Sequence, residues 1–265
     1  MAGVFRSGTA LRIGRAATII CQHKPYSFLS PSTGVAGNKQ FAIDLLTMKN
    51  LRGKQWDKSW GNPCDVRGLQ CAGRLDADST GLLLWTNDDA LQQYIIGPHT
   101  TVEKEYLVRV RNHEAWTQQQ MDDSLELLRS GSVDMDGKPL LPASVRRINE
   151  SQLQVVLIEG RHRQIRRMCA VVGLEVVALK RVRIGNLRLA SLPVGCWSSL
   201  TPPMAASLLL PRHPGSKANE SRKARPPQLH WRSDATRARA SGSAHPSKLD
   251  VEHGASGARP RPGHR

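Results

Sequence analysis

Long apolar runs and paired cysteines are both missing from this chain of 265 residues. No stretch of about eighteen apolar residues occurs, so we expect no helix that spans a membrane. The five cysteines are odd in number and scattered, and no two of them form a C-x-x-C pair. This pattern argues against a disulfide framework and against a zinc site, and it indicates a reducing compartment.

Acidic residues are also scarce, because 22 Asp and Glu stand against 38 Lys and Arg and leave a formal net charge of +16. The first acidic residue is Asp44. A strongly basic chain calls for an anionic partner, and nucleic acid is the commonest partner of this kind. The hydrophobic fraction of 39% is low for a fully packed chain, which indicates that part of the sequence lies outside a core.

The two ends of the chain concentrate the basic charge. Residues 208–265 hold 12 Lys and Arg against 4 Asp and Glu and are rich in Pro, Ser and Ala, so this tail is predicted to be disordered. It is either a solvating tail or a nonspecific phosphate-binding arm. Residues 1–16 carry Arg6, Arg12 and Arg15, as an organelle presequence or a plain basic N-terminus would. We expect a cytoplasmic protein in a bacterium, and a mitochondrial or plastid protein in a eukaryote.

Residues 17–207 alternate short strand and helix patterns and form the predicted catalytic domain. Strands are expected at 18–23, 69–75, 82–86, 102–110, 153–158 and 176–182, and helices at 41–48, at 116–128 and at 163–172. A further helix, capped by Asn87 or Asp88, is expected to run to Ile96. Gly131 is expected to end the helix at 116–128. Strands follow one another too often for a doubly wound parallel sheet, so a largely antiparallel α+β domain is predicted.

The stretch GRLDADSTGLLLWTND, from Gly73 to Asp88, admits three interpretations. A calcium loop needs a bidentate Glu at its twelfth position, where this chain has Asn87, and LLLW replaces further ligands. An ordinary turn between strands suits the residues from Asp78 to Gly81. The third interpretation is a catalytic carboxylate, and it falls on Asp76.

Asp76 differs from its neighbours because it lies on the strand side of the predicted turn, two residues after Arg74. In an extended strand the two side chains point to the same face. A nearby guanidinium keeps a carboxylate ionised in an enclosed site, which a nucleophile or base requires.

A second cluster, EGRHRQIRRM at residues 159–168, brings arginines to the start of a predicted helix. Ile165 and Met168 face inward, and the arginines form either a solvated basic face or the phosphate-binding edge of a pocket. The arginines concerned are Arg161, Arg163, Arg166 and Arg167.

Together these stretches resemble the RsuA/RluB/RluE/RluF family of ribosomal RNA pseudouridine synthases. The matching motifs are GRLD with STGLLLxTND, EKEY at 103–106, EGRxRQIRRM, Lys-Pro at 24–25, LPA at 141–143 and LKRVRIGNLRLASLPVGCW through Trp197. The resemblance runs from about residue 18 to residue 201. It implies the pseudouridine synthase fold, with two α+β halves around a bent, mainly antiparallel sheet and the active cleft between them. Family members commonly begin with a small RNA-binding domain, which we expect to be absent here.

The resemblance implies a site-specific isomerisation of uridine to pseudouridine in ribosomal RNA, with the large subunit favoured. This RNA modification is redox-neutral, so no cofactor and no metal are expected. By resemblance Asp76 attacks the sugar or removes its 2′ proton, and these two routes stay open. The target base is flipped out of its stack, and Arg74 is expected to occupy the gap that it leaves.

Other site residues follow from the same resemblance. Tyr106 would give the uracil a flat face and a hydroxyl near carbon 5, Arg166 would pair with Asp76, and Ile165 would pack against the base. The residues expected to bind the RNA backbone are Arg161, Arg163, Arg167 and Lys24.

The expected partner is ribosomal RNA in pre-ribosomal particles, bound by a monomer. One alternative is a noncatalytic RNA-binding factor of ribosome assembly that keeps the fold. Another is a hydrolytic glycosidase, which normally needs two carboxylates. Asp78 is the only close second carboxylate, and the turn accounts for it.

Overall fold

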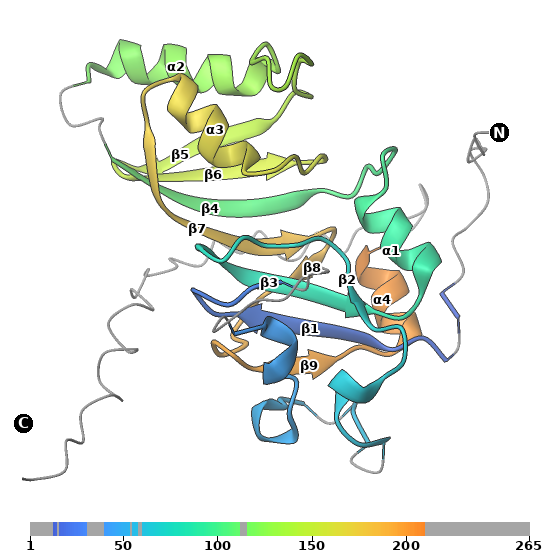
Figure 1. Ribbon diagram of the computed structural model, residues 1–265. Coiled ribbons are helices and arrows are strands. Elements are labelled where there is room, and N and C mark those ends of the chain that lie inside the picture. The colour runs from blue at the N-terminus through green and yellow to red at the C-terminus, as the bar shows by residue number, and fades with distance from the viewer. Residues whose placement is uncertain are drawn as a thin grey trace, which may run out of the picture. The chain divides into compact units, whose positions relative to one another are not determined.

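The computed structural model describes residues 13–14, 16–30, 40–53, 55–57, 60–111 and 116–209 (Figure 1). Most of the predicted leader and tail, including Arg6, Arg12 and Arg15, lies outside the described residues. Helix α4 (Pro202–Leu209) runs past residue 207, where the catalytic domain was expected to end. No helix in the described ranges is long and apolar enough to cross a membrane.

Nine strands of the described chain form one sheet, whose main path runs β5-β6-β4-β7-β3-β1-β9. The strands on this path are β1 (Ile19–Lys24), β3 (Ser79–Thr86), β4 (Lys104–Arg111), β5 (Ser144–Asn149), β6 (Gln152–Leu157), β7 (Glu175–Ile184) and β9 (Trp197–Ser199). The short strands β2 (Gln70–Cys71) and β8 (Leu187–Arg188) pair with β3 and β7. Every named pair is antiparallel except β3 with β7. The predicted α+β class with a mainly antiparallel sheet is therefore confirmed.

The helices cover the sheet in two groups, each with its own core. Figure 1 shows α2 (Gln118–Ser130) and α3 (Gln164–Val171) together over the β5-β6-β4 part of the sheet, and α1 (Asp89–Ile96) close to α4. One apolar cluster joins α2 and α3 to the strands beneath them, and a second joins α1 and α4 to β1 and β3. Strand β3 is buried along its whole length because Leu82 and Leu84 enter this second cluster while Leu83 and Trp85 enter a third on the opposite face.

Cap chemistry predicted two helix ends correctly. The Asp88 side chain accepts a hydrogen bond of 2.8 Å from Leu91 N at the start of α1, as an N-cap carboxylate does. Gly131 ends α2 in the left-handed conformation, with φ of 74°. Residues 41–48 differ from the expectation, because they form the 3₁₀ helices η1 (Ala42–Leu45) and, from Met48, η2 (Met48–Asn50) instead of one α-helix.

The region around the predicted turn also differs from the expectation. The strand expected at 69–75 is only Gln70–Cys71, because Gly73, with φ of 100°, turns the chain out of the sheet. Strand β3 already begins at Ser79, where it pairs with Leu179 of β7. The turn is therefore Ala77–Asp78, and Gly81 belongs to the strand rather than to the turn.

The parallel contact of β3 with β7 requires a glycine at position 81. Gly81 has φ of 107° and lies opposite Arg181. A Cβ at this position would stand 2.7 Å from the Arg181 amide nitrogen and closer still to its carbonyl oxygen. Both atoms are backbone, so neither can rotate away.

We predict that Gly81→Ala lowers the free energy of unfolding by about 3 kcal/mol or more, because backbone strain and overpacking act together. Gly137→Ala is the matched control, since Gly137 has φ of 72° and nothing within 4 Å of the added Cβ. It should lose only the backbone part, about 1 kcal/mol. Urea unfolding of both variants measures the difference, and equal losses would show that the β3–β7 approach does not require glycine.

Candidate active site

A cleft of about 800 Å³ lies between the 73–76 loop, β4 and the start of α3. It gathers most of the residues singled out by sequence, namely Arg74, Asp76, Tyr106, Arg161, Arg163 and Ile165. Lys24, Arg166 and Arg167 do not line it. Segments far apart in the chain, from Leu69 to Arg181, thus meet in one concave site.

The backbone around Asp76 is fixed from several sides. Ser30 Oγ donates to Leu75 O at 2.8 Å and accepts from Leu75 N at 2.9 Å. Ser79 N donates to Asp76 O at 3.1 Å, and Ser27 N donates to Ala77 O at 2.8 Å. The Asp76 side chain itself is 35% exposed, so a rigid backbone presents a carboxylate that a ligand can reach.

Arg181 of β7 is a buried arginine that sequence reasoning missed. It is only 3% exposed, and its guanidinium donates to Leu82 O at 2.7 Å, to Gly73 O at 2.8 Å and more distantly to Arg74 O. These bonds tie the entrance of the 73–76 loop to β3. The signal was present, because an arginine at an inward position of a strand must find carbonyl or carboxylate partners.

The arginine nearest to Asp76 is Arg163 and not Arg166. Arg163 Nη1 lies 3.7 Å from Asp76 Oδ2. The guanidinium of Arg166 instead donates to Asp78 O at 2.9 Å and to Val176 O at 2.8 Å. The predicted pairing of Arg166 with Asp76 is therefore corrected. Hydrogen bonds to the carbonyls of Asp78 and Val176 hold the guanidinium of Arg166 away from Asp76.

Asp78 receives both arginines. Its two carboxylate oxygens accept from Arg163 at 3.2 and 3.0 Å, and Oδ2 lies 3.2 Å from Arg166 Nη2. Burial opposes ionisation of Asp78, but the hydrogen bonds from Arg163 and the charge of Arg166 outweigh it and lower the pKa of this carboxyl. Asp78 is thus an ion-pair centre as well as a turn residue.

Lys24 contributes charge from beneath the carboxylates. It is fully buried, and its Nζ donates to Pro25 O at 2.9 Å. Burial lowers its pKa to about 8, while the charges of Asp76 and Asp78 act in the opposite direction. A side chain without exposed surface has nothing to offer to an RNA backbone, so its place in the fold does not support the predicted RNA contact.

The apolar wall of the cleft comes from β4 and α3. Tyr106 and Ile165 are 9% and 5% exposed, and both line the cleft. Lys104, two residues before Tyr106, lines the same wall and donates from Nζ to Ile158 O at 3.1 Å. Burial, with a smaller effect of the Arg181 charge, lowers the pKa of Lys104 to about 8.

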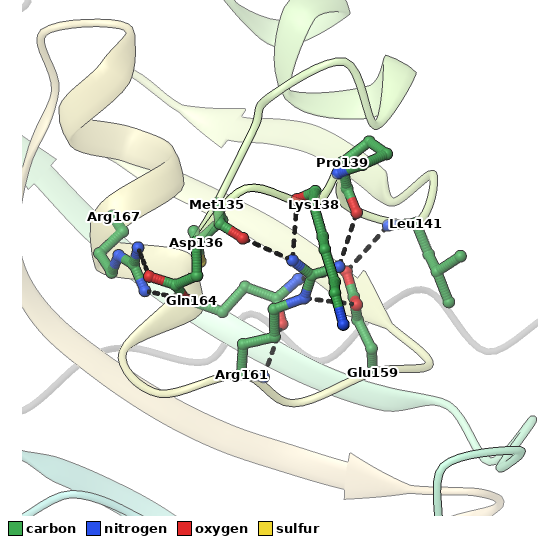
Figure 2. A network of polar contacts seen from close by, with 9 residues as sticks. All are labelled: Met135, Asp136, Lys138, Pro139, Leu141, Glu159, Arg161, Gln164 and Arg167. Carbon is green, nitrogen blue, oxygen red and sulfur yellow. Dashed lines mark hydrogen bonds and ion pairs between the residues drawn. The ribbon is translucent and has the colours of Figure 1, made fainter.

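The guanidinium of Arg161 holds a loop (Figure 2). Its guanidinium donates to the carbonyls of Met135, Lys138 and Pro139 at 2.8, 2.9 and 2.6 Å, and to Glu159 Oε2 at 3.2 Å. With its donors used in this way, the expected phosphate contact of Arg161 finds no support in its geometry.

Glu159 and Gln164 complete this network, and neither was predicted. Glu159 Oε1 accepts from Leu141 N at 2.9 Å and from Gln164 Nε2 at 2.8 Å (Figure 2). Arg167 lies apart from the cleft, where it holds the exposed Asp136 through two hydrogen bonds of 2.9 and 2.7 Å.

Comparison with known proteins agrees with this fold. A sequence profile described as RNA pseudouridylate synthase matches residues 18–171. "Ribosomal large subunit pseudouridine synthase E" of Vibrio vulnificus is 34% identical over 203 residues, which cover 70% of this chain and 76% of that protein. "Ribosomal small subunit pseudouridine synthase A" of Escherichia coli K12 is 38% identical over 143 residues, which cover 53% of this chain and 59% of that protein.

Two further relatives extend the comparison. An "Uncharacterized RNA pseudouridine synthase" of Aquifex aeolicus is 38% identical over 136 residues, 51% of this chain and 54% of that protein. The chain thus spans about half to three quarters of the length of these curated relatives. A solved "Crystal structure of pseudouridylate synthase" shares the fold with a TM-score of 0.57 and 24% identity, covering 74% of this chain and 75% of that one. The chain belongs to the RNA pseudouridylate synthase family, within its RsuA/RluB/RluE/RluF branch.

We predict that Arg161→Ala frees the 135–139 loop. The amides of Met135 and Leu140, which now donate within the loop to Lys138 O and Val133 O, should exchange with solvent at least about tenfold faster, since the guanidinium that holds three carbonyls is gone. Arg167→Ala is the control, because an exposed ion pair contributes little. Hydrogen exchange read residue by residue measures both, and unchanged protection in Arg161→Ala would contradict the loop-holding role.

We predict that Lys104→Met stabilises the protein most at neutral pH. Because the pKa of about 8 in the folded protein lies below the ordinary lysine value of 10.5, the charged form is penalised in the fold. This penalty is complete below about pH 8 and is relieved as pH rises toward 10.5. The gain should therefore approach about 2 kcal/mol at pH 7, after the loss of the Ile158 hydrogen bond, and shrink by about pH 10.

Urea unfolding of the wild type and Lys104→Met at both pH values measures this change. Lys49→Met, at an exposed position, is the control for replacing a lysine by methionine. A Lys104→Met gain that stays constant between the two pH values would mean that Lys104 is not penalised by burial.

Proposed function

We propose that the protein isomerises uridine to pseudouridine in ribosomal RNA. The family relationship supports the reaction class, and the relatives are named for ribosomal RNA. The observation that carries the proposal is the cleft, in which a partly exposed carboxylate, Asp76, shares one concave surface with Tyr106 and Ile165.

Asp76 is the catalytic carboxylate of this proposal. The reaction breaks the bond between ribose carbon 1′ and uracil nitrogen 1, turns the base, and joins carbon 1′ to carbon 5. Asp76 either attacks the sugar or removes its 2′ proton. Both routes need an ionised oxygen that can reach the sugar, and a guanidinium at 3.7 Å favours the ionised form without a short hydrogen bond.

The wall of Tyr106 and Ile165 suits a base that has left its stack. A uridine inside folded RNA hides its glycosidic bond, so the nucleotide must be extruded, at a cost of a few kcal/mol. A buried aromatic ring and an aliphatic side chain give the flipped uracil two flat apolar contacts. The Tyr106 hydroxyl is then the nearest candidate to assist loss of the proton from carbon 5. Arg74 is exposed and lines the cleft, and we expect it to occupy the gap in the RNA.

The RNA partner is expected to be large-subunit ribosomal RNA in a pre-ribosomal particle, bound by a monomer. Vibrio vulnificus and Yersinia pestis relatives are named for the large subunit, at 34% and 35% identity. The net charge of +16 supports binding to the RNA backbone. Among the arginines at the cleft, Arg163 keeps an exposed side chain that a phosphate can approach.

We predict that Asp76→Asn abolishes pseudouridine formation and leaves RNA affinity within about threefold of wild type, because the amide keeps the shape but supplies neither nucleophile nor base. The measurement uses ribosomal RNA transcripts labelled with tritium at carbon 5 of uridine. Tritium enters water only when carbon 5 loses its hydrogen.

Filter binding of the same transcripts is the control for folding and affinity. Release of tritium by Asp76→Asn at the wild-type rate would remove Asp76 from the mechanism. A wild-type protein that binds ribosomal RNA and never releases tritium from it would favour the noncatalytic assembly factor.

A further inference from the structure

Asp78, and not Asp76, carries the hydrogen bonds of the arginines at the cleft. Arg163 donates to both of its carboxylate oxygens, from Nη1 at 3.2 Å and from Nη2 at 3.0 Å. Arg166 adds an ion pair of 3.2 Å to the carboxylate and a hydrogen bond of 2.9 Å to the Asp78 carbonyl. Arg163 and Arg166 therefore form hydrogen bonds with Asp78 but not with Asp76, although both acidic residues belong to the GRLDAD stretch.

The contact of Arg163 with Asp76 is electrostatic only. The distance of 3.7 Å between Arg163 Nη1 and Asp76 Oδ2 exceeds the 2.7–2.9 Å or so that a charge-assisted hydrogen bond needs. One guanidinium thus serves two carboxylates. It is hydrogen-bonded to Asp78 and close enough to Asp76 to favour its ionised form.

This difference matters for a carboxylate that has to react. A forked guanidinium occupies both oxygens of its partner, and those bonds would have to break before an oxygen could reach a ribose. An ionised carboxylate without such a fork keeps its lone pairs available. The chemistry is therefore favoured when Arg163 lies near Asp76 without forming a forked hydrogen bond to it.

The backbone is fixed both at the turn that carries Asp76 and Asp78 and at Arg163. Asp78 directly precedes Ser79, whose strand is held in register by β7, and the Ser79 N to Asp76 O bond closes the turn that carries both acids. Arg163 directly precedes α3 in a left-handed conformation, with φ of 50°. With both main chains fixed, Arg163 pairs with whichever carboxylate, Asp76 or Asp78, can accept two hydrogen bonds from its guanidinium.

We propose that Asp78 is a positioning residue. By accepting two hydrogen bonds from the Arg163 guanidinium, it keeps the carboxylate oxygens of Asp76 open to the ribose of the target nucleotide. The proposal rests on the function proposed above and assigns a task to a residue that the turn alone does not explain. Removing the charge of Asp78 should turn Arg163 onto Asp76.

The charged groups around the turn of Asp76 and Asp78 decide how pH would report this change. Besides the two carboxylates, they are Lys24 of β1, Arg163 just before α3, Arg166 of α3, Arg181 of β7 and Arg74 of the loop. Losing Asp78 removes the only other anion of this set and frees one guanidinium. Both changes favour the ionised form of Asp76. The acid limb of kcat/KM, which reports the essential carboxylate of the free enzyme, should move to lower pH.

The test compares Asp78→Asn with Asp136→Asn. Asp136 is a matched control, because Arg167 of the same helix grips it in the same forked geometry outside the cleft. Tritium release from labelled ribosomal RNA is measured from about pH 5 to about pH 9, together with RNA affinity. Asp78→Asn should lower kcat about tenfold to a hundredfold, leave RNA affinity within about threefold, and move the acid limb down by about one pH unit. Asp136→Asn should follow the wild-type profile.

A double variant separates positioning from simple structural support. In Asp78→Asn with Arg163→Gln the freed guanidinium is gone, so kcat should recover by about fivefold or more over Asp78→Asn alone. An acid limb that does not move, or a double variant no faster than the single one, would overturn the proposal, as would an unaltered kcat in Asp78→Asn. A wild-type protein without tritium release would instead reject the proposed function itself, so the two failures are distinct.

Discussion

The close parallel approach of β3 to β7 is the constraint on which the site depends. It places Gly81 directly against the Arg181 backbone, and the Arg181 side chain reaches back to the loop at Gly73. The same approach starts β3 immediately after the turn that carries Asp76 and Asp78. A glycine, a buried arginine and a single parallel register therefore hold the Asp76 carboxylate at the edge of the cleft.

At the cleft, pairing with the arginines and presenting a carboxylate with open oxygens fall to two different aspartates. Asp78 satisfies the arginines at the start of α3, and Asp76 stays within their field without being covered. Below them Lys24 adds a buried positive charge. Arg161 and Glu159 perform a different task, because they fasten the 135–139 loop beside the start of α3 (Figure 2). The arginines of this segment mostly pair with carbonyls and carboxylates of the protein itself, and Arg163 also lies 3.7 Å from Asp76.

Local signals predicted the class of the fold and much of its order. Caps such as Asp88 and Gly131 act over three or four residues, so the sequence shows them directly. The choice of partner among neighbouring charges does not show in this way. Asp78 and Arg163 are 85 residues apart, and their contact depends on the register of β3 with β7. For this reason the expected pairing of Arg166 with Asp76 was wrong. Lys24, expected at the RNA, is buried, and the guanidinium of Arg161, which lines the cleft, is hydrogen-bonded to the 135–139 loop. Arg181 was missed because a single arginine in a strand does not reveal which carbonyls it meets.

The account as a whole rests on one reactive carboxylate that acts on ribosomal RNA, and a map of pseudouridines in cells tests this most directly. Ribosomal RNA from cells that lack the protein should contain an unmodified uridine at a position that is pseudouridine in the parent. The wild-type chain should restore the modification at that position, and the chain with asparagine at residue 76 should not. A complete map that is identical with and without the protein would contradict the account.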